Sequence, residues 1–343
     1  MTRYFRVVLI VCALFIILPL SAQPYTSVLS FPSSSGYVAV PHSSAFDFTD
    51  GYTFEAWVSI TDPSGGCKSI FGNGYTTAQR VGICGTTLRS YLRGLGGTNF
   101  LLDAGTVPPN DWTHIAVTWD GTTHRHFIDG EEVAARAESG NMTNNTNEIR
   151  IGSDVAYNFT PTGSIDEVRF WNVALTKEQI RANITKTINS ALPGLVAVYH
   201  LDGSAVDSVG GHNGSLTGAA AFQPLTASTC VSNATTLCFE SNRFTVTAKW
   251  QTASGTGNGT VVPGATSNSG LFWFFGSDNW ELLIKELNGC PVNARRWIFS
   301  AATTNVHYRL SVIDGSTGAV RRYFNYQGDS APAVNDTGAF ACP

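Results

Sequence analysis

The chain has 343 residues, of which only 13% are charged, and its formal net charge at pH 7 is −4. Its 21 lysines and arginines are outnumbered by 25 acidic residues and form no basic run longer than Arg295-Arg296 or Arg321-Arg322. Nucleic-acid-binding proteins need a basic patch, so we exclude nucleic acid as a partner. The 34 glycines and the abundance of Ser, Thr and Asn are typical of an extracellular β protein with many turns.

The first 22 residues are expected to be a targeting segment. Arg3 and Arg6 precede an uncharged, mostly apolar run over residues 7–20, which ends just before Ser21-Ala22. This pattern predicts a secretory signal peptide, because the alternative, a membrane anchor, needs roughly 20 apolar residues. No later stretch is apolar enough to span a membrane. We therefore expect the mature chain to have no transmembrane segment and to be secreted, extracellular or periplasmic, where disulfides form.

Six cysteines remain after removal of the segment that carries Cys12, and they are Cys67, Cys84, Cys230, Cys238, Cys290 and Cys342. Two precede residue 226 and four follow it, which predicts one bridge in the first part of the chain and two in the second. Cys67 must then pair with Cys84. Three pairings are open to the last four, and we favour the one that joins Cys230 to Cys342. Metal ligation is the competing use, but no CxxC pair is present.

In the favoured pairing, Cys238 joins Cys290 inside the second part of the chain, while the other bridge ties together its two ends. The choice among the three pairings is not decided by the spacing of the cysteines.

Short strands dominate the first part. Apolar residues alternate with others over 52–60 and again over 115–119, a period of two that marks strands with one core face. Asp120-Gly121 and Asp129-Gly130 mark two hairpin turns within ten residues. Further short strands bounded by Gly, Asp or Asn are expected at 148–151, 165–171 and 195–201. Together they predict an all-β sandwich.

A short helix and a domain boundary follow. Thr176 and Gln179 form a capping box that predicts a helix starting there. Between residues 217 and 232 the periodicity lapses into Gly, Ala, Pro, Thr and Ser, which places a boundary near residue 226. We therefore expect domains at 27–226 and 230–343. The second restarts the strand pattern at 244–249 and contains two further hairpins, at 270–285 and 308–324, so it is expected to be a smaller β sandwich or barrel.

The segment 110–121, NDWTHIAVTWDG, followed by 127–133, FIDGEEV, resembles the central signature of laminin-G-like jelly rolls, which share the concanavalin A-like and pentraxin-like fold. Other pieces agree in the same order, and they lie at 29–31 with 36–38, at 52–58, at 149–152 and at 163–171. The resemblance covers about residues 27–222. It implies an antiparallel double sheet used in extracellular recognition of glycans or matrix proteins, but no particular ligand.

The same resemblance implies a calcium ion at the sheet edge, as in many members, and Asp166 in the Ile-Asp-Glu-Val motif is the candidate ligand. Calcium needs several hard oxygen ligands. The first strand of the family often carries acidic or Asn residues near its turn, whereas residues 31–36 of this chain offer none. A structural hydrogen bond of Asp166 is the alternative, and we favour it. The second domain resembles small cysteine-containing β domains of secreted bacterial proteins, to which no activity attaches.

No catalytic constellation is found. Glycosidases of this fold carry two carboxylates on one strand that face the same bond, whereas Glu131-Glu132 and Asp166-Glu167 are adjacent and point to opposite faces. Nucleophile elbows, phosphate loops and HExxH motifs are missing as well. His124 and His126 would face one side of a strand, a spacing that zinc or copper could use, but no third ligand is evident. We favour ordinary polar or half-buried histidines.

The densest aromatic group lies between residues 272 and 280. Alternation sends Phe272 and Phe274 to one face of a strand, and Trp273 and Phe275 to the other. One pair must be core, while the other is either core too or an exposed platform for sugar rings. Burial is the default, and Trp273, Phe275 and Trp280 are the candidate ligand-binding residues.

The sequence therefore predicts a secreted recognition or adhesion protein rather than an enzyme. Its jelly roll would bind a glycan or another extracellular polymer through edge loops, with calcium as the candidate cofactor, and the second domain would add a contact. The alternatives are a structural surface module without a small ligand and, more distantly, an accessory or degenerate glycoside hydrolase. Exposed aromatic side chains beside polar loops would favour binding, and two carboxylates converging in a cleft would favour hydrolysis.

Overall fold

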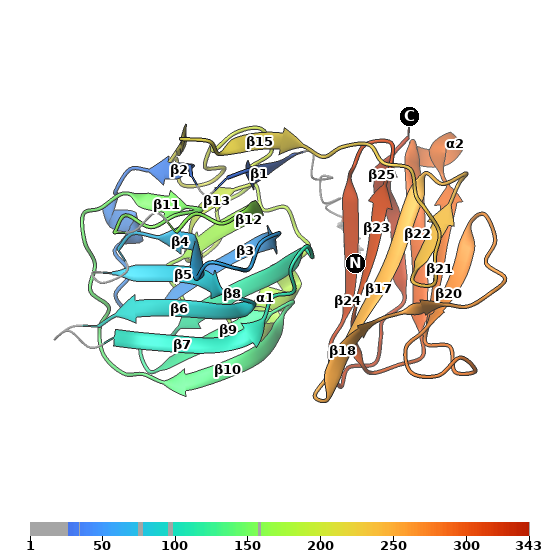
Figure 1. Ribbon diagram of the computed structural model, residues 1–343, viewed down its shortest axis with the longest axis horizontal. Helices are drawn as coiled ribbons and strands as arrows, with labels where there is room; N and C mark the ends of the chain where they lie inside the picture. Colours follow the sequence, from blue (N-terminus) through green and yellow to red (C-terminus); the bar gives the residue numbers. More distant parts are fainter. Residues whose placement is uncertain (1–26, 34, 75–77, 95–98, 157–158, 343) are drawn as a thin grey trace, which may run out of the picture.

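The computed structural model describes residues 27–33, 35–74, 78–94, 99–156 and 159–342. The predicted signal peptide lies outside these residues. In this part of the chain no helix is long and apolar enough to cross a membrane. The strands form two antiparallel sandwiches that stand side by side (Figure 1). The predicted all-β class is confirmed.

The first sandwich has two sheets. One contains, from edge to edge, β10 (Glu131–Ala137), β9 (Thr123–Ile128), β8 (Thr113–Trp119), β3 (Tyr52–Ile60), β12 (Gly163–Trp171), β1 (Ser27–Phe31) and β15 (Ala221–Pro224), with β13 (Leu195–Tyr199) beside β12. The other contains β14 (Ser215–Thr217), β2 (Tyr37–Val40), β11 (Ile149–Ile151), β4 (Cys67–Gly72), β5 (Gln79–Cys84), β6 (Thr87–Arg93) and β7 (Asn99–Thr106). A 3-10 turn, η1 (Ser44–Phe46), and one helix, α1 (Lys177–Asn183), complete it.

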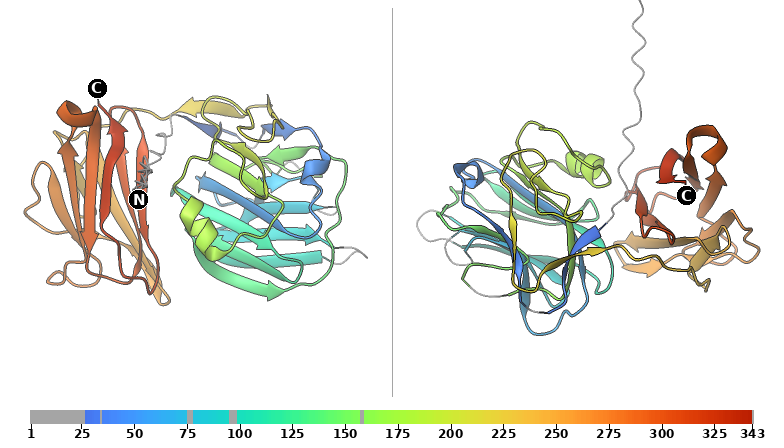
Figure 2. Two further views of the ribbon diagram at one scale, coloured as in Figure 1. Left: turned by 180° about the vertical axis from the view of Figure 1, so that it is seen from behind. Right: turned by 90° about the horizontal axis from the view of Figure 1, so that it is seen from above.

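The second sandwich follows after a connection that leaves β15 (Figure 2). Its first sheet contains β16 (Thr236–Phe239), β17 (Phe244–Thr252), β23 (His307–Asp314) and β24 (Val320–Asn325), with β18 (Gly255–Asn258) beside β17. Its second sheet contains β19 (Thr260–Val261), β20 (Ser269–Trp273), β21 (Leu282–Asn288), β22 (Arg295–Ala302) and β25 (Val334–Ala341). The single-turn helix α2 (Cys290–Asn293) precedes β22. The predicted boundary near residue 226 falls between β15 and β16.

Strand β3 is buried on both faces, although its period of two predicts only one core face. Phe54 and Val58 pack between the sheets, as alternation requires. On the other face Glu55 and Trp57 are also buried, with 0% and 2% of their surfaces exposed. The reason is tertiary, because α1, the loop after it and the second sandwich cover that outer face. The Trp57 indole, for example, donates to the carbonyl of Ile184 at 3.1 Å.

Helix α1 begins as its capping box predicts. The Thr176 hydroxyl accepts from the backbone N–H of Gln179 at 3.3 Å, and the Gln179 side chain accepts from the N–H of Thr176 at 2.8 Å. Ile180 then packs against Trp171 and Leu175 on the outer face of the eight-stranded sheet. The helix therefore closes over polar residues that would otherwise meet water.

Beneath α1 lies a buried ionic network centred on Arg169. Its guanidinium donates to Glu167 at 2.8 Å and to Glu55 at 3.4 Å. Trp171 also donates to Glu55, at 3.1 Å, and His200 contacts Glu167 at 2.6 Å. Burial would raise the pKa of Glu55, but His114 and Arg169 hold it below its ordinary value. Buried charges are tolerated only when paired in this way.

Replacing Arg169 by Met should destabilise the protein by about 3–5 kcal/mol, because the substitution leaves Glu55 and Glu167 buried without their cation. Urea unfolding followed by circular dichroism measures the loss. Arg89→Met is the matched control, since Arg89 pairs with Asp103 near the surface and such a pair contributes only about 0–1 kcal/mol. Equal losses in the two variants would contradict this account of the network.

The disulfides confirm one predicted pairing and correct two. Cys67 and Cys84 are register partners on β4 and β5 and are bonded. The second bridge joins Cys230 to Cys238. The favoured link of Cys230 to the end of the chain is therefore wrong. A tight turn explains it, because Asn233 and Thr236 bond each other and bring the chain back on itself.

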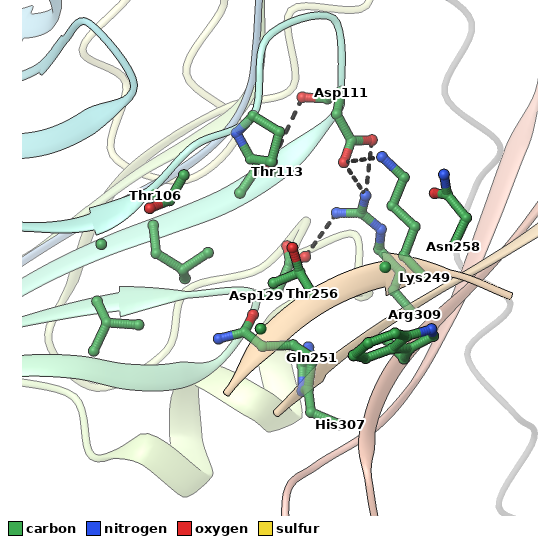
Figure 3. Close-up of a pocket in the computed structure, with 17 residues that line it drawn as sticks. Thr106, Asp111, Thr113, Asp129, Lys249, Gln251, Thr256, Asn258, His307 and Arg309 are labelled. Atoms are coloured by element: carbon green, nitrogen blue, oxygen red, sulfur yellow. Dashed lines mark hydrogen bonds and ion pairs between the residues drawn. The ribbon is translucent and has the colours of Figure 1, made fainter. Parts of the chain in front are cut away.

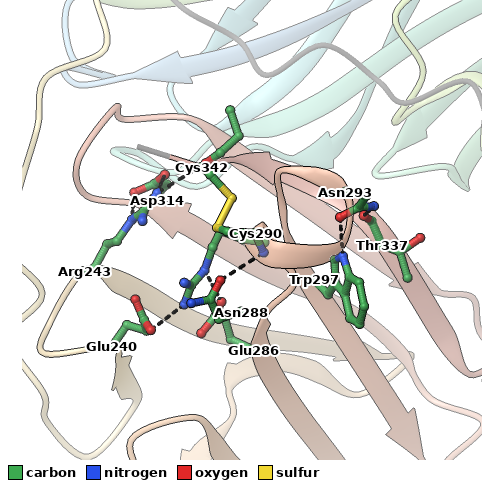
Figure 4. The surroundings of a disulfide bond; sticks show 12 residues. Glu240, Arg243, Glu286, Asn288, Cys290, Asn293, Trp297, Asp314, Thr337 and Cys342 are labelled. Carbon is green, nitrogen blue, oxygen red and sulfur yellow. Dashed lines mark hydrogen bonds and ion pairs between the residues drawn. A yellow bond between two sulfur atoms is a disulfide. The ribbon is translucent and has the colours of Figure 1, made fainter.

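The third bridge joins Cys290 to Cys342 (Figure 4), so the favoured pairing of Cys238 with Cys290 is also wrong. Strand β25 pairs with β22 with Arg295 opposite Ala341, which places the last residues beside α2. The N–H of Cys342 donates to the carbonyl of Ala294 at 3.3 Å. Sheet register decided these pairings, and spacing along the chain does not reveal register.

Candidate binding site between the two sandwiches

Arg309 of β23 is the main contact between the sandwiches. Its side chain is 5% exposed and donates to both oxygens of Asp111, at 2.8 and 2.7 Å, and to Asp129 at 2.7 Å (Figure 3). It also donates to the carbonyl of Trp112 at 2.5 Å. Lys249 of β17 adds a second cation on Asp111, at 2.7 Å. The second sandwich thus supplies the cations, and the first supplies the carboxylates.

The chain positions these carboxylates through its turns. Asp129 has a positive φ of 48° and Gly130 one of 80°, the backbone of the predicted Asp-Gly turn between β9 and β10. One Asp129 oxygen accepts from the N–H of His114 at 2.8 Å, which leaves the other for Arg309. Asp111 lies in the loop before β8. The two carboxylates therefore converge on one guanidinium from two loops at the same edge of the sheet.

The charges in this cluster stabilise one another. Burial opposes the charge on Arg309, but Asp129 and Asp111 raise the pKa of its guanidinium above the ordinary value. Burial would likewise raise the pKa of Asp111, but Arg309 and Lys249 lower it below the ordinary value. Asp111 therefore stays ionised at neutral pH and cannot serve as the general acid that a glycosidase requires. Two carboxylates do converge here, but on an arginine.

A second contact group surrounds Glu131 of β10. Its carboxylate accepts from Arg181 of α1 at 2.7 Å and from the N–H of Gln327 at 2.8 Å, and it lies 3.6 Å from His307. The Arg181 guanidinium stacks on the ring of Tyr326, 3.9 Å from its centre. The loop after β24 is thereby held against helix α1.

A third contact covers Trp57. The guanidinium of Arg322 lies 4.3 Å from the centre of its ring, and Phe324 lies 6.3 Å from it. Because β24 carries both residues, the strand seals the outer face of β3. The interface is therefore continuous from β10 to β3 and holds the two sandwiches in one orientation.

Beside the Arg309 cluster the interface opens into a cavity of about 620 Å³. This volume lies in the range of small-molecule sites, ~300–1,000 Å³. The hairpin β17–β18 extends beyond its sandwich and forms one wall (Figure 1). Four neutral polar side chains line the cavity without a hydrogen bond to any described residue, and they are Thr106, Gln251, Thr256 and Asn258. They can donate to or accept from a ligand.

Trp250 also lines the cavity. Gly257 lies opposite it on β18, and a Cβ at Gly257 would come within 2.5 Å of the indole, so only glycine allows this packing. The indole nitrogen of Trp250 is buried and has no hydrogen-bond partner among the described residues. The ring of Phe275 lies 4.9 Å away. The cavity therefore has an aromatic side as well as a polar one.

The aromatic residues predicted from the sequence divide between core and surface. Phe272 and Phe274 are buried and Trp273 is half-buried, whereas Phe275 and Trp280 are exposed. In the described part of the first sandwich no aromatic side chain is exposed to that degree. The exposed rings thus lie on the second sandwich, and the role of Trp273, Phe275 and Trp280 in ligand binding stays a prediction.

Asp166, the candidate calcium ligand, lies far from the cavity on the outer face of β12. Its carboxyl group is buried, and one oxygen, Oδ1, has no hydrogen-bond partner among the described residues. Burial and the nearby Glu167 and Asp202 raise its pKa well above the ordinary value. Within the described ranges no group of three or more His, Cys, Asp or Glu side chains has the arrangement of a metal site. Calcium stays a prediction.

His124 and His126 do face the same side of β9, as their spacing predicts. The Nε2 atoms of both rings lie 2.6 Å from the hydroxyl of Ser90, and Nδ1 of His126 lies 3.0 Å from the carbonyl of Ala104. Burial lowers their pKa values, to about 3 for His124 and about 4 for His126. Both rings are thus neutral, polar members of the core.

The sequence did not single out Arg309, Lys249, Gln251 or Asn258. The strand pattern places Lys249 and Gln251 on one face of β17, but it does not reveal what that face meets. Asp111 and Asp129 stand inside the recognised motif, where they mark turns. Their shared partner lies about 180 to 200 residues further along the chain.

The comparisons with known proteins bear on the first sandwich. Residues 32–181 match the family model described as the Concanavalin A-like lectin/glucanases superfamily. The resemblance to laminin-G-like jelly rolls is thereby confirmed for this part of the chain.

Relatives and solved structures share this fold at low identity. Pappalysin-1 of Mus musculus is 30% identical over 101 residues, 27% of this chain and 6% of its own length. A Bacteroides ovatus protein assigned to carbohydrate binding is 23% identical over 59% of this chain and 60% of its own, with a TM-score of 0.49. The CBM40 module of a Ruminococcus gnavus sialidase, bound to α2,3 sialyllactose, is 15% identical over 47% of this chain and 98% of its own, with a TM-score of 0.38. Such values carry no argument about a ligand.

Acid should loosen the contact between the sandwiches. Burial would raise the pKa of Glu131, but His307, Gln327 and Arg181 lower it from 4.5 to about 2. A lowered carboxyl pKa stabilises the docked state above pH 4.5, and that stability is lost as pH falls towards 2. Small-angle X-ray scattering should show the two sandwiches separating in this window while circular dichroism still reports folded sheets.

Glu131→Gln is the matched variant, because it keeps the shape and removes the titrating group. We expect its scattering profile to depend less on pH between 4.5 and 2. An unchanged dependence would show that Glu131 does not hold the interface.

Proposed function

We propose that this protein binds a neutral glycan in the cavity between its two sandwiches. The observation that carries the proposal is the lining of the cavity, where every charged group near Arg309 is paired and the unpaired polar side chains are neutral. The superfamily whose model matches the first sandwich is described by lectins and glucanases, which is in keeping with a carbohydrate ligand.

Sugar hydroxyls both donate and accept hydrogen bonds, and so do the cavity groups. The amides of Gln251 and Asn258 each offer a carbonyl oxygen and an NH2 group, and the hydroxyls of Thr106 and Thr256 offer both roles. The buried indole N–H of Trp250 is a further donor. A ligand that satisfies these groups must carry many small polar groups around an apolar ring, as a pyranose does. Such placed polar groups beside apolar surface are typical of small-molecule sites.

A neutral ligand fits better than an acidic one. Sialic and uronic acids need a cation that is free to pair with their carboxylate. Arg309 and Lys249 both point into this region, but Asp111 and Asp129 already neutralise them. An acidic sugar would have to displace an internal carboxylate and leave it buried, which is costly.

The same pairing supports binding rather than catalysis. Hydrolysis of a glycosidic bond by paired carboxylates needs one carboxyl group that stays protonated. The pKa of Asp111 is lowered instead, and Asp129 is held by Arg309. The exposed rings of Phe275 and Trp280 favour ligand binding over a purely structural surface module.

We place the protein outside the cytosol, as a secreted or periplasmic recognition or adhesion protein. Its three disulfides are the supporting observation, because such bonds persist in oxidising compartments and are rare in the cytosol.

A glycan array carrying neutral and acidic sugars tests the proposal directly. We expect selective binding of neutral glycans by the full chain, and at least tenfold weaker binding by Gln251→Ala and Asn258→Ala, because each loses hydrogen bonds to the ligand. Gln223→Ala is the matched control, since Gln223 is exposed on β15, outside the cavity lining. Binding restricted to acidic glycans, or equal loss in the control, would contradict the cavity assignment.

Calcium is an additional part of the proposal and rests on Asp166 alone. An ion held there, with Glu167 and Asp202 nearby, would relieve their mutual repulsion and use the unpartnered oxygen. We then expect chelator to lower the melting temperature of the wild type but not of Asp166→Asn. Identical melting of the wild type with and without chelator would remove calcium from the proposal.

A further inference from the structure

The turn between β20 and β21 presents two aromatic rings to solvent. Phe275 is 54% exposed and Trp280 is 51% exposed. Throughout the described residues, these are the two aromatic side chains that are exposed rather than buried or half-buried. Large rings left in water lose the stabilisation that burial would give them, so their exposure on one turn calls for a reason.

This turn is built to hold its shape. An isolated bridge pairs Gly276 with Asn279, so Phe275 and Trp280 stand on the two arms of one tight turn. The buried carboxylate of Glu281 accepts from the N–H of Phe274 at 2.6 Å and from the Asn279 side chain. The two rings are therefore presented by a fixed backbone.

Each ring also has an internal tie. The Trp280 indole donates to the carbonyl of Ser277 at 3.0 Å, which satisfies its nitrogen and leaves the apolar surface of the ring as its exposed part. Phe275 packs against Trp250, with 4.9 Å between ring centres. Because Trp250 lines the cavity, Phe275 continues the aromatic side of the cavity onto the surface.

We propose that Phe275 and Trp280 form an outer subsite that stacks on further sugar units of the glycan held in the cavity. This inference rests on the proposed function and adds to it the length of the ligand. The bound molecule is an oligosaccharide that runs from Gln251 and Asn258, past Trp250, to the exposed turn. Aromatic rings suit this task because the C–H faces of pyranoses are apolar while their edges are polar.

A ladder of chain lengths tests the subsite. Cello-, laminari-, manno- and xylo-oligosaccharides of one to six units are titrated calorimetrically against the full chain. We expect the affinity for the recognised series to rise with each added unit and then to level off. Phe275→Ala and Trp280→Ala should each weaken the longest ligand about tenfold, while binding of the shortest detectable ligand changes less than about twofold.

Two controls separate the subsite from the cavity and from general surface effects. Gln251→Ala should weaken ligands of every length, because it acts in the cavity. Val292→Ala, 74% exposed on α2, should leave every affinity unchanged. Circular dichroism and melting temperatures confirm that each variant is folded.

The outcomes distinguish this inference from the proposed function. If Gln251→Ala weakens binding but the two ring variants bind the longest ligand as the wild type does, the subsite is overturned and the cavity stands. If the ring variants weaken all lengths equally, they act on the cavity itself and the subsite is again overturned. If no neutral glycan binds, both fail. If the ring variants only abolish self-association in sedimentation runs, the turn is a contact between copies of this chain and the subsite is overturned.

Discussion

The insertion of Arg309 between Asp111 and Asp129 is the interaction on which the rest of the structure depends. A guanidinium that is 5% exposed needs complete compensation, and the two carboxylates and a backbone carbonyl supply it. These partners come from the other sandwich, so the ion pair forms only when the sandwiches are docked. The cavity next to it has walls from both sandwiches and therefore exists only in the docked state.

The eight-stranded sheet makes this docking feasible because its outer face is not a solvent face. Helix α1 covers one part of it and strand β24 covers another, and the buried network around Arg169 lies beneath the helix. The same helix provides Arg181, which reaches Glu131 and Tyr326 at the interface. Stability of the first sandwich and orientation of the second are thus coupled through a single short element.

Charge pairing and aromatic exposure together define what the site can recognise. Because Arg309 and Lys249 are already neutralised, hydrogen bonds from Gln251, Asn258 and the threonines are what remains for a ligand. The aromatic side runs from Trp250 to Phe275 and on to the exposed turn. A cavity with neutral polar groups on one side and rings along the other matches the two faces of a sugar chain.

The sequence alone determined the β class, the jelly-roll family of the first part, the capping box of α1, the Cys67–Cys84 bridge and the Asp-Gly turn at Asp129. Each of these follows from short-range patterns, such as a period of two, a turn pair or an ordered motif, which act within a few residues. It also placed Phe275 in an aromatic group, without deciding between core and surface.

Only the tertiary structure decided the binding site and the remaining disulfides. Arg309 meets Asp111 across a separation of 198 residues, and no local pattern encodes which loop faces which strand. Cys342 reaches Cys290 because β25 pairs with β22, a register set by the whole sheet. Exposure likewise depends on every neighbour at once, so the solvent-facing rings of Phe275 and Trp280 became evident only when both sheets of the second sandwich were in place.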